Sequence, residues 1–108
     1  MKYMDHWDAA QRAAADTKVD ALNAAPRTVT KVVRSGGQRR MMKSAGMAID
    51  DMEDADHLVD LQVGGEDALH NLWALDRSVN RSLGAQISGQ VKSMGLSPGD
   101  VIAAFRIS

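Results

Sequence analysis

The segment from residue 55 to residue 94 constrains the fold of this chain most strongly, because two short apolar runs are followed there by a long helical repeat. Residues 55–61 have strand character and lead into the turn-forming pair Gly64-Gly65. Residues 72–75 are too few for a helix, so we expect them to form the return strand of a small hairpin. The pattern therefore predicts a hairpin followed directly by a helix.

The expected helix runs from about residue 77 to residue 94. Asp76 can act as its N-cap, because a carboxylate can accept hydrogen bonds from the free amides of the first turn. Apolar residues recur at steps of four along this stretch, and Gly95 ends the pattern. They are Val79, Leu83, Ile87 and Val91. This stripe is expected to pack on the hairpin, with Asn80 at its border.

Shorter elements are expected around this unit. Residues 8–25 are rich in Ala and contain no Gly or Pro, which predicts a helix. Residues 28–34 are β-branched and largely alternate, as in a strand, and residues 38–45 are expected to form a short helix ended by Gly46. For the tail, a strand over residues 101–107 is favoured over a helix.

The sequence thus predicts an α+β fold, with a hairpin-plus-helix core, an N-terminal helix and additional short strands. A length of 108 residues suits one domain. Its parts are an N-terminal helical segment (1–26), a basic strand and helix segment (27–46), the hairpin and helix (55–94) and the tail (95–108).

The absence of Cys limits the metal chemistry of the chain. Disulfides and thiolate zinc sites are excluded, so any metal must be held by oxygen and imidazole nitrogen, which favours Mg²⁺ or a similar hard cation. No apolar run reaches the ~18 residues of a membrane-spanning helix, and the first residues lack a signal-peptide pattern. We expect no membrane association, and export would require another carrier, for instance a larger protein of which this chain is one end.

Charge is segregated along the chain although the net charge is only −1. Residues 27–43 contain six Lys or Arg and no acidic residue, whereas residues 50–67 contain eight Asp or Glu and no Lys or Arg. The low net charge argues mildly against a nucleic-acid partner. The segregation, however, can offer phosphates a basic arm beside an acidic pole that a divalent cation partly neutralises. Solvated surface is the alternative interpretation of both runs.

An Asp-His pair and two Asn residues in the hairpin-and-helix segment have the chemistry that phosphodiester hydrolysis requires. Asn71 lies 14 residues after His57, and Asn80 lies 9 residues after Asn71. The reaction requires an activated water and a cation that neutralises charge on the phosphate. His57 suits the general base, because the imidazole pKa lies near neutrality. Asp56 and Asn80 offer the oxygens that would hold the cation.

The remaining candidates orient the site or contact the substrate. Asn71 is neutral, so we expect it to bridge the loop and fix the backbone that carries His57. Because neighbouring strand residues point to opposite faces, Asp56 and His57 can act together only at a strand end, a twist or a bulge. Four arginines are candidate phosphate contacts, with plain surface charge as the alternative. They are Arg39, Arg40, Arg77 and Arg81.

This arrangement resembles the HNH family of nucleases, also called ββα-metal or His-Me finger nucleases, in the variant whose last metal position is Asn. The resemblance rests on Asp56-His57, Gly64-Gly65, Asn71-Leu72 and Asn80-Arg81. It implies an endonuclease with one divalent cation, foremost Mg²⁺ with Mn²⁺ as an alternative. His57 would be the base, Asp56 and Asn80 the metal ligands and Asn71 the loop-ordering residue. Many family members carry a Cys pair for structural zinc, which this chain lacks, so no structural zinc is expected.

The longer strings over residues 56–65 and 75–87 are similar to toxin domains at the C-terminal ends of bacterial polymorphic toxins, including Rhs-type and type VI secretion effectors. This similarity implies secretion within a larger effector, action on DNA in the cytoplasm of a target cell, and neutralisation by an immunity protein. Two alternatives stay open. One is an RNase of the same fold, and the other is a non-catalytic module that binds nucleic acid or protein.

Overall fold

A two-stranded hairpin carries the candidate residues in this computed structural model, which describes residues 1–108. Strand β1 (Glu53–His57) pairs antiparallel with β2 (Leu72–Asp76). The loop between the strands contains two 3₁₀ turns, η1 (Leu61–Val63) and η2 (Leu69–Asn71). With three α-helices and this antiparallel sheet, the protein is a small α+β domain.

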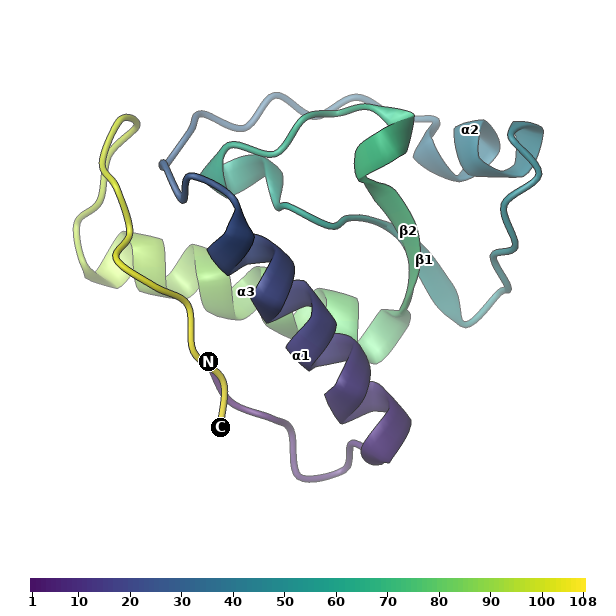
Figure 1. Cartoon of the computed structure of the whole chain (residues 1–108), viewed down its shortest axis with the longest axis horizontal. Helices are drawn as coiled ribbons and strands as arrows, with labels where there is room; N and C mark the ends of the chain where they lie inside the picture. The colour runs from purple at the N-terminus through teal and green to yellow at the C-terminus, as the bar shows by residue number, and fades with distance from the viewer.

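Three helices surround the hairpin (Figure 1). Helix α3 (Arg77–Ser93) begins directly after β2, because the Asp76 carboxylate accepts a hydrogen bond from the Val79 amide and caps the first turn. Helix α1 (Ala9–Ala24) begins with a capping box and lies across α3. Helix α2 (Gln38–Ser44) lies apart from both, beside the hairpin. None of these helices combines the length and apolar character needed to span a membrane.

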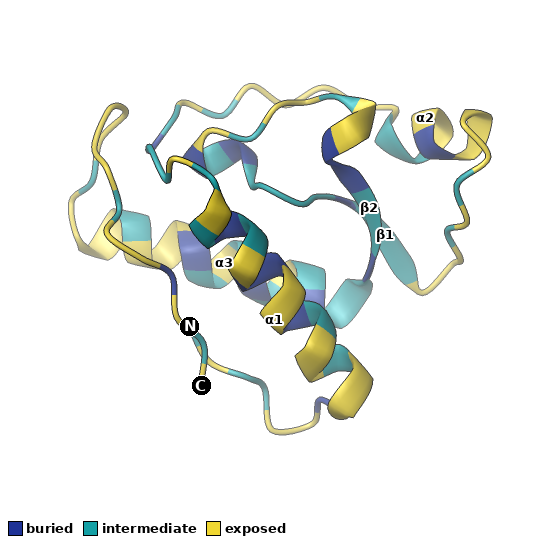
Figure 2. Ribbon diagram, in the orientation of Figure 1, coloured by how far each residue is buried: buried dark blue, intermediate teal, exposed yellow.

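The apolar stripe of α3 joins two clusters of buried side chains. The first cluster contains Trp7, Ala15, Leu75, Val79 and Leu83. The second contains Val19, Leu22, Val63, Ile87 and Phe105. Each cluster combines side chains from α1 and α3, so the core lies where these helices meet each other and the hairpin (Figure 2). The core thereby fixes α3 against the loop and strand that carry the candidate site.

Backbone hydrogen bonds hold the two ends of the chain together. The Tyr3 amide donates to the Ser108 carbonyl at 3.1 Å, and the Ser108 amide donates to the Met1 carbonyl at 3.2 Å. Both termini therefore lie side by side on the face of the molecule that α1 occupies (Figure 1).

The predicted helices over residues 8–25, 38–45 and 77–94 are confirmed to within two residues at each end. The return strand is also confirmed. The first strand, predicted over residues 55–61, instead starts two residues earlier and ends at His57. It ends there because the chain then turns into η1, where the Asp60 carboxylate accepts from the Gln62 amide.

Two further strand predictions are wrong. Residues 28–34 and 101–107 form no strand, and only an isolated antiparallel bridge joins Thr28 to Val101. The extended backbone of the first segment bonds irregularly, since the Val29 amide donates to Asp100 and the Thr30 amide donates to Gln62. Backbone groups satisfied by loops in this way need no regular ladder.

Candidate functional site

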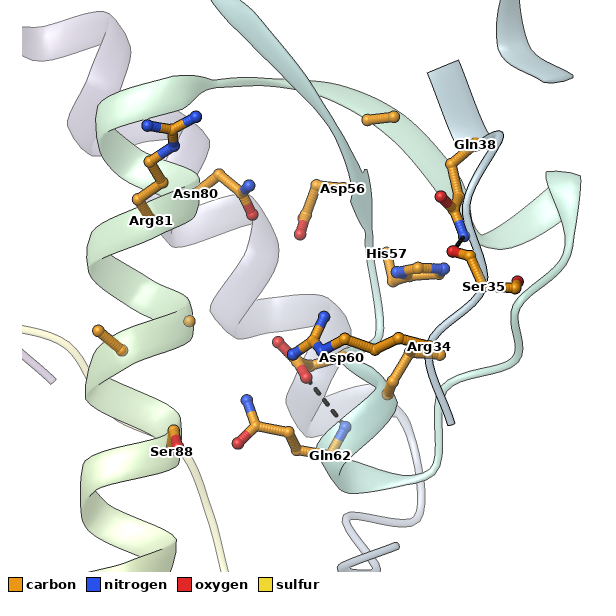
Figure 3. A pocket seen from close by; sticks show the side chains of 14 residues that line it. Arg34, Ser35, Gln38, Asp56, His57, Asp60, Gln62, Asn80, Arg81 and Ser88 are labelled. Atoms are coloured by element: carbon orange, nitrogen blue, oxygen red, sulfur yellow. Dashed lines mark hydrogen bonds between the residues drawn. The ribbon is translucent and has the colours of Figure 1, made fainter. Parts of the chain in front are cut away.

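A polar cavity of about 460 Å³ lies between β1, α3 and the loop segments near residues 34–38 and 60–62 (Figure 3). Asp56, His57 and Asn80 all line this cavity, so the three side chains predicted to cooperate share one space. Further along α3 the wall consists of small residues. They are Gly84, Ala85 and Ser88. The cavity therefore extends along α3 from Asn80 to Ser88.

His57 is the last residue of β1, so the Asp-His pair lies at a strand end, one of the three arrangements expected from the sequence. Its side chain is 15 % exposed, and Nε2 lies 2.8 Å from Oδ1 of Asp67. The ring points toward Ser35 and Gln38 in Figure 3. Both of these residues donate to the Asp67 carboxylate. Hydrogen bonds from Ser35, then His57 and Gln38, lower the pKa of Asp67 to about 2, so this residue is an anion at neutral pH.

Asp56 is buried and already has two donors. Its Oδ2 accepts from Nζ of Lys18 and from Nε1 of Trp73, each at 2.7 Å. Its Oδ1 accepts no hydrogen bond and belongs to a residue that lines the cavity. Burial raises the pKa of Asp56, although the Lys18 ammonium opposes this effect. Lys18 also donates to the His57 carbonyl at 2.7 Å, so one buried lysine holds both members of the Asp-His pair.

Asn80 projects from the first turn of α3 toward Asp56 (Figure 3). Its Nδ2 donates to Oδ2 of Asp54 at 2.9 Å, which leaves the amide oxygen without a donor. Burial raises the pKa of Asp54, but hydrogen bonds from Asn80 and Arg77 outweigh it and keep this pKa below its usual value. The charged Asp54 therefore orients Asn80 so that its oxygen is the group free to bind a ligand.

The free oxygens define what cation this cavity could hold. No three His, Cys, Asp or Glu side chains form a group that could hold a metal ion. Asp56 and Asn80 instead offer one carboxylate and one amide oxygen, and Asp60 adds a second negative charge to the cavity wall. Two oxygen donors fit a hard cation that keeps several waters, as Mg²⁺ does. Lys18 offsets one negative charge and so weakens this attraction.

Asn71 makes the bridging contacts expected of it. Its Oδ1 accepts from the Val59 amide at 2.9 Å, and its Nδ2 donates to the carbonyls of Val59 and Glu66. The Asn71 carbonyl also accepts from the Leu58 amide. The loop is tight at Gly65, where a Cβ atom would lie 1.7 Å from the Val59 carbonyl oxygen. Asn71 thus ties the segment after His57 to the start of β2.

The four arginines predicted to contact phosphate have different surroundings. Arg39 donates to the backbone carbonyls of Asp50 and Glu53, which supports the start of β1. Arg40 is exposed and lines a separate basic hollow beside α2. Arg77 and Arg81 both pair with Asp54, at 3.1 and 3.5 Å, and only Arg81 lines the cavity.

Sequence reasoning missed three residues of this site. Arg34 lines the cavity and forms no ion pair. In the sequence it is marked only as one of the six basic residues of the segment 27–43. Lys18 lies three positions after buried Ala15 and four before buried Leu22, so its place on the inward face of α1 was detectable. Asp67 had no comparable signal, because its contact with His57 depends on how the Gly-Gly loop folds back.

The cavity thus brings together an imidazole with an anionic partner, two free oxygens and two arginines, Arg34 and Arg81. It leaves Arg39, Arg40 and Arg77 outside its wall. In comparisons with known proteins, the chain matches no family model, no curated protein and no solved structure.

Proposed function

We propose that this protein is a metal-dependent DNA endonuclease of the HNH type. The observation that carries the proposal is the shared polar cavity of Asp56, His57 and Asn80, three residues selected from the sequence. The order β1, loop, β2 and α3 agrees with the strand, loop, strand and helix order of that family. The Asn71 bridge across the loop is a further point of agreement.

In the proposed reaction His57 is the general base. With its Nε2 bonded to Asp67, the ring has Nδ1 left to take a proton from water, and the resulting hydroxide attacks phosphorus. Asp56 and Asn80 would hold the cation through their free oxygens, and the cation, when bound, supplies positive charge to the phosphate. Asn71 keeps the backbone next to His57 in place. Lys18 does the same for the Asp56 carboxylate.

The walls of the cavity support a nucleic-acid substrate. Arg34, from the segment before α2, and Arg81, from α3, both line the cavity, where guanidinium groups can bind phosphate oxygens. The small residues of α3 allow a backbone to approach the helix closely. An RNA strand would meet the same groups, so the RNase alternative differs from the proposal only in substrate.

The toxin similarity extends this proposal. We infer that the domain acts in a target cell after delivery within a larger bacterial effector, and that a cognate immunity protein blocks it in the producing cell. The test is toxicity: expression of the wild-type domain in bacterial cytoplasm should stop growth, and the His57→Ala variant should not. Equal toxicity of the two proteins would contradict it.

Cleavage of supercoiled plasmid tests the activity directly. Wild type should cut with Mg²⁺ and not with chelator, and His57→Ala should lose at least ~10²-fold, the usual contribution of a general base. Asn80→Ala should also lose cutting and should require more Mg²⁺. The matched control is His70→Ala, because the His70 side chain is 69 % exposed and its only ion pair is with Glu66. Binding of DNA without any cutting would instead identify a non-catalytic binding module. Parallel digestion of DNA and RNA distinguishes a DNase from an RNase.

A further inference from the structure

Asp67 is the nearest anionic neighbour of the proposed base, and nothing in the sequence pattern assigned it a role. It lies in the loop after Gly65, ten residues after His57, with its Oδ1 2.8 Å from Nε2 of that residue. The contact joins the end of β1 to the loop between the strands. It is distinct from the Asn71 bridge, which involves the backbone of Val59 and Glu66.

Two side chains from the segment before α2 hold this carboxylate in place. Ser35 donates its hydroxyl proton to Oδ2 of Asp67, and Gln38 donates from Nε2 to both oxygens at 3.2 and 3.4 Å. With His57 as the third donor, the carboxylate has little freedom to rotate away from the imidazole. The three donors also keep it ionised at neutral pH, because each bond favours the charged form.

The ionised carboxylate determines which nitrogen of His57 carries the proton. A carboxylate only accepts hydrogen bonds, so Nε2 must be protonated to make the 2.8 Å contact. In a neutral imidazole the other nitrogen, Nδ1, is then the acceptor. When Nδ1 takes up a proton, the nearby negative charge stabilises the imidazolium that forms.

We propose that Asp67, held by Ser35 and Gln38, is a positioning residue that fixes His57 as the Nε2–H tautomer with Nδ1 free to deprotonate water. The inference deepens the proposed nuclease function and rests on it. The water proton moves to Nδ1, the hydroxide oxygen forms a bond to phosphorus, and the bond from phosphorus to the leaving oxygen breaks. The leaving oxygen takes a proton from solvent, and His57 returns its extra proton to water.

Nitrogen chemical shifts of the ¹⁵N-labelled imidazoles test this inference without any substrate. The His57 signals are assigned by their loss in His57→Gln. Wild type should show Nε2 protonated and Nδ1 unprotonated in the neutral imidazole. Asp67→Asn should shift the population toward the Nδ1–H tautomer, because an amide can donate to Nε2. Glu66→Gln is the matched control: it changes the neighbouring carboxylate, whose only ion pair is with exposed His70, and it should leave the His57 tautomer unchanged.

Cleavage kinetics give the second readout. Asp67→Asn should lower kcat by ~10²- to 10⁴-fold, since a wrong tautomer removes the acceptor from the water. KM should change less than twofold, and Glu66→Gln should keep wild-type kcat. Ser35→Ala, which retains the carboxylate, should show a smaller loss than Asp67→Asn.

The two hypotheses fail in different ways. An Nδ1–H tautomer in wild type, or an unchanged tautomer in Asp67→Asn, overturns the role of Asp67 whatever the activity. A kcat of Asp67→Asn equal to that of Glu66→Gln overturns it as well. Absence of cleavage by wild type on every nucleic acid and metal, with the expected tautomers, rejects the nuclease function and leaves the positioning of the ring standing.

Discussion

Replacing Lys18 with Met tests the buried ion pair behind the candidate site. Lys18 has no exposed surface, and its Nζ lies 2.7 Å from both Oδ2 of Asp56 and the carbonyl oxygen of His57. Met has a similar length and no charge, so the variant largely preserves packing while it removes both hydrogen bonds. Asp56 then keeps only Trp73 as a donor to its buried oxygen.

The expected cost is large for a domain of this size. Removing one partner of a buried ion pair costs ~3–5 kcal/mol, because the remaining charge is left without compensation. That is a substantial part of the ~5–15 kcal/mol by which such domains are stable. Urea unfolding followed by tryptophan fluorescence measures the loss. Lys31→Met is the control: Lys31 is exposed and forms no ion pair, so its substitution should change stability by less than ~0.5 kcal/mol.

The pH dependence of the loss identifies its cause. Burial already raises the pKa of Asp56, and without Lys18 this pKa rises further. A folded pKa above the unfolded value means that the folded state binds the proton more tightly. The stability of Lys18→Met therefore falls as pH rises from about 4 through the raised pKa and then levels. The loss of unfolding free energy relative to wild type should be smaller at pH 5 than at pH 8. The double variant Lys18→Met/Asp56→Asn should recover part of this loss.

A loss of unfolding free energy below ~1 kcal/mol in Lys18→Met would refute the reasoning, because Asp56 would then not need Lys18 to compensate its buried charge. A deficit of the same size at pH 5 and pH 8 would also refute it. So would a double variant no more stable than Lys18→Met alone.

Three further predictions concern the loop and α3. The pKa of Asp67, lowered to about 2, means that its stabilising contribution is present above pH ~4 and is lost as pH falls toward 2; Asp67→Asn should flatten the urea-derived stability profile over that range, and an unchanged slope would contradict this. Gly65→Ala places a Cβ against the Val59 carbonyl oxygen and should lower the free energy of unfolding by more than ~2 kcal/mol. Gly89→Ala, at a helical position with open space around it, should raise the free energy of unfolding by ~0.5–1 kcal/mol. Calorimetric melting temperatures that shift in the same direction in both variants would be inconsistent with this geometry. Asp76→Ala removes the cap of α3 and should cost ~0.5–2 kcal/mol in urea unfolding, and a neutral effect would mean that the cap contributes nothing.

The elements that could be predicted from the sequence are those with local signals. The helix after Asp76 was detectable from a capping residue, a four-residue apolar period and a terminal Gly, all within one segment. The segment over residues 28–34 carried a strand composition but no information on a partner. Its neighbours in the structure are Asp100 and Gln62, both distant in sequence and both in loops. Alternating β-branched residues suit any extended backbone, whether or not a ladder forms.

The candidate site likewise contains residues with a sequence signal and residues without one. Asp56, His57 and Asn80 could be predicted because their side-chain chemistry, their spacing and a family resemblance link them, and they do share a cavity. Lys18 and Asp67 reach the site from other elements, and a charged residue is ordinarily expected on the surface. Their positions follow only from how α1 packs against the hairpin and how the Gly-Gly loop folds back.

Part of the acidic run over residues 50–67 is paired within the fold. Asp54 pairs with Arg77 and Arg81, Asp56 pairs with Lys18, and Asp67 bonds to His57. The basic run behaves differently, because four of its side chains are exposed and form no ion pair. They are Lys31, Arg34, Arg40 and Lys43. An approaching phosphate would meet Arg34 at the cavity and Arg40 and Lys43 at the separate hollow beside α2, so the net charge of −1 does not describe the charge that a polyanion meets at these two places.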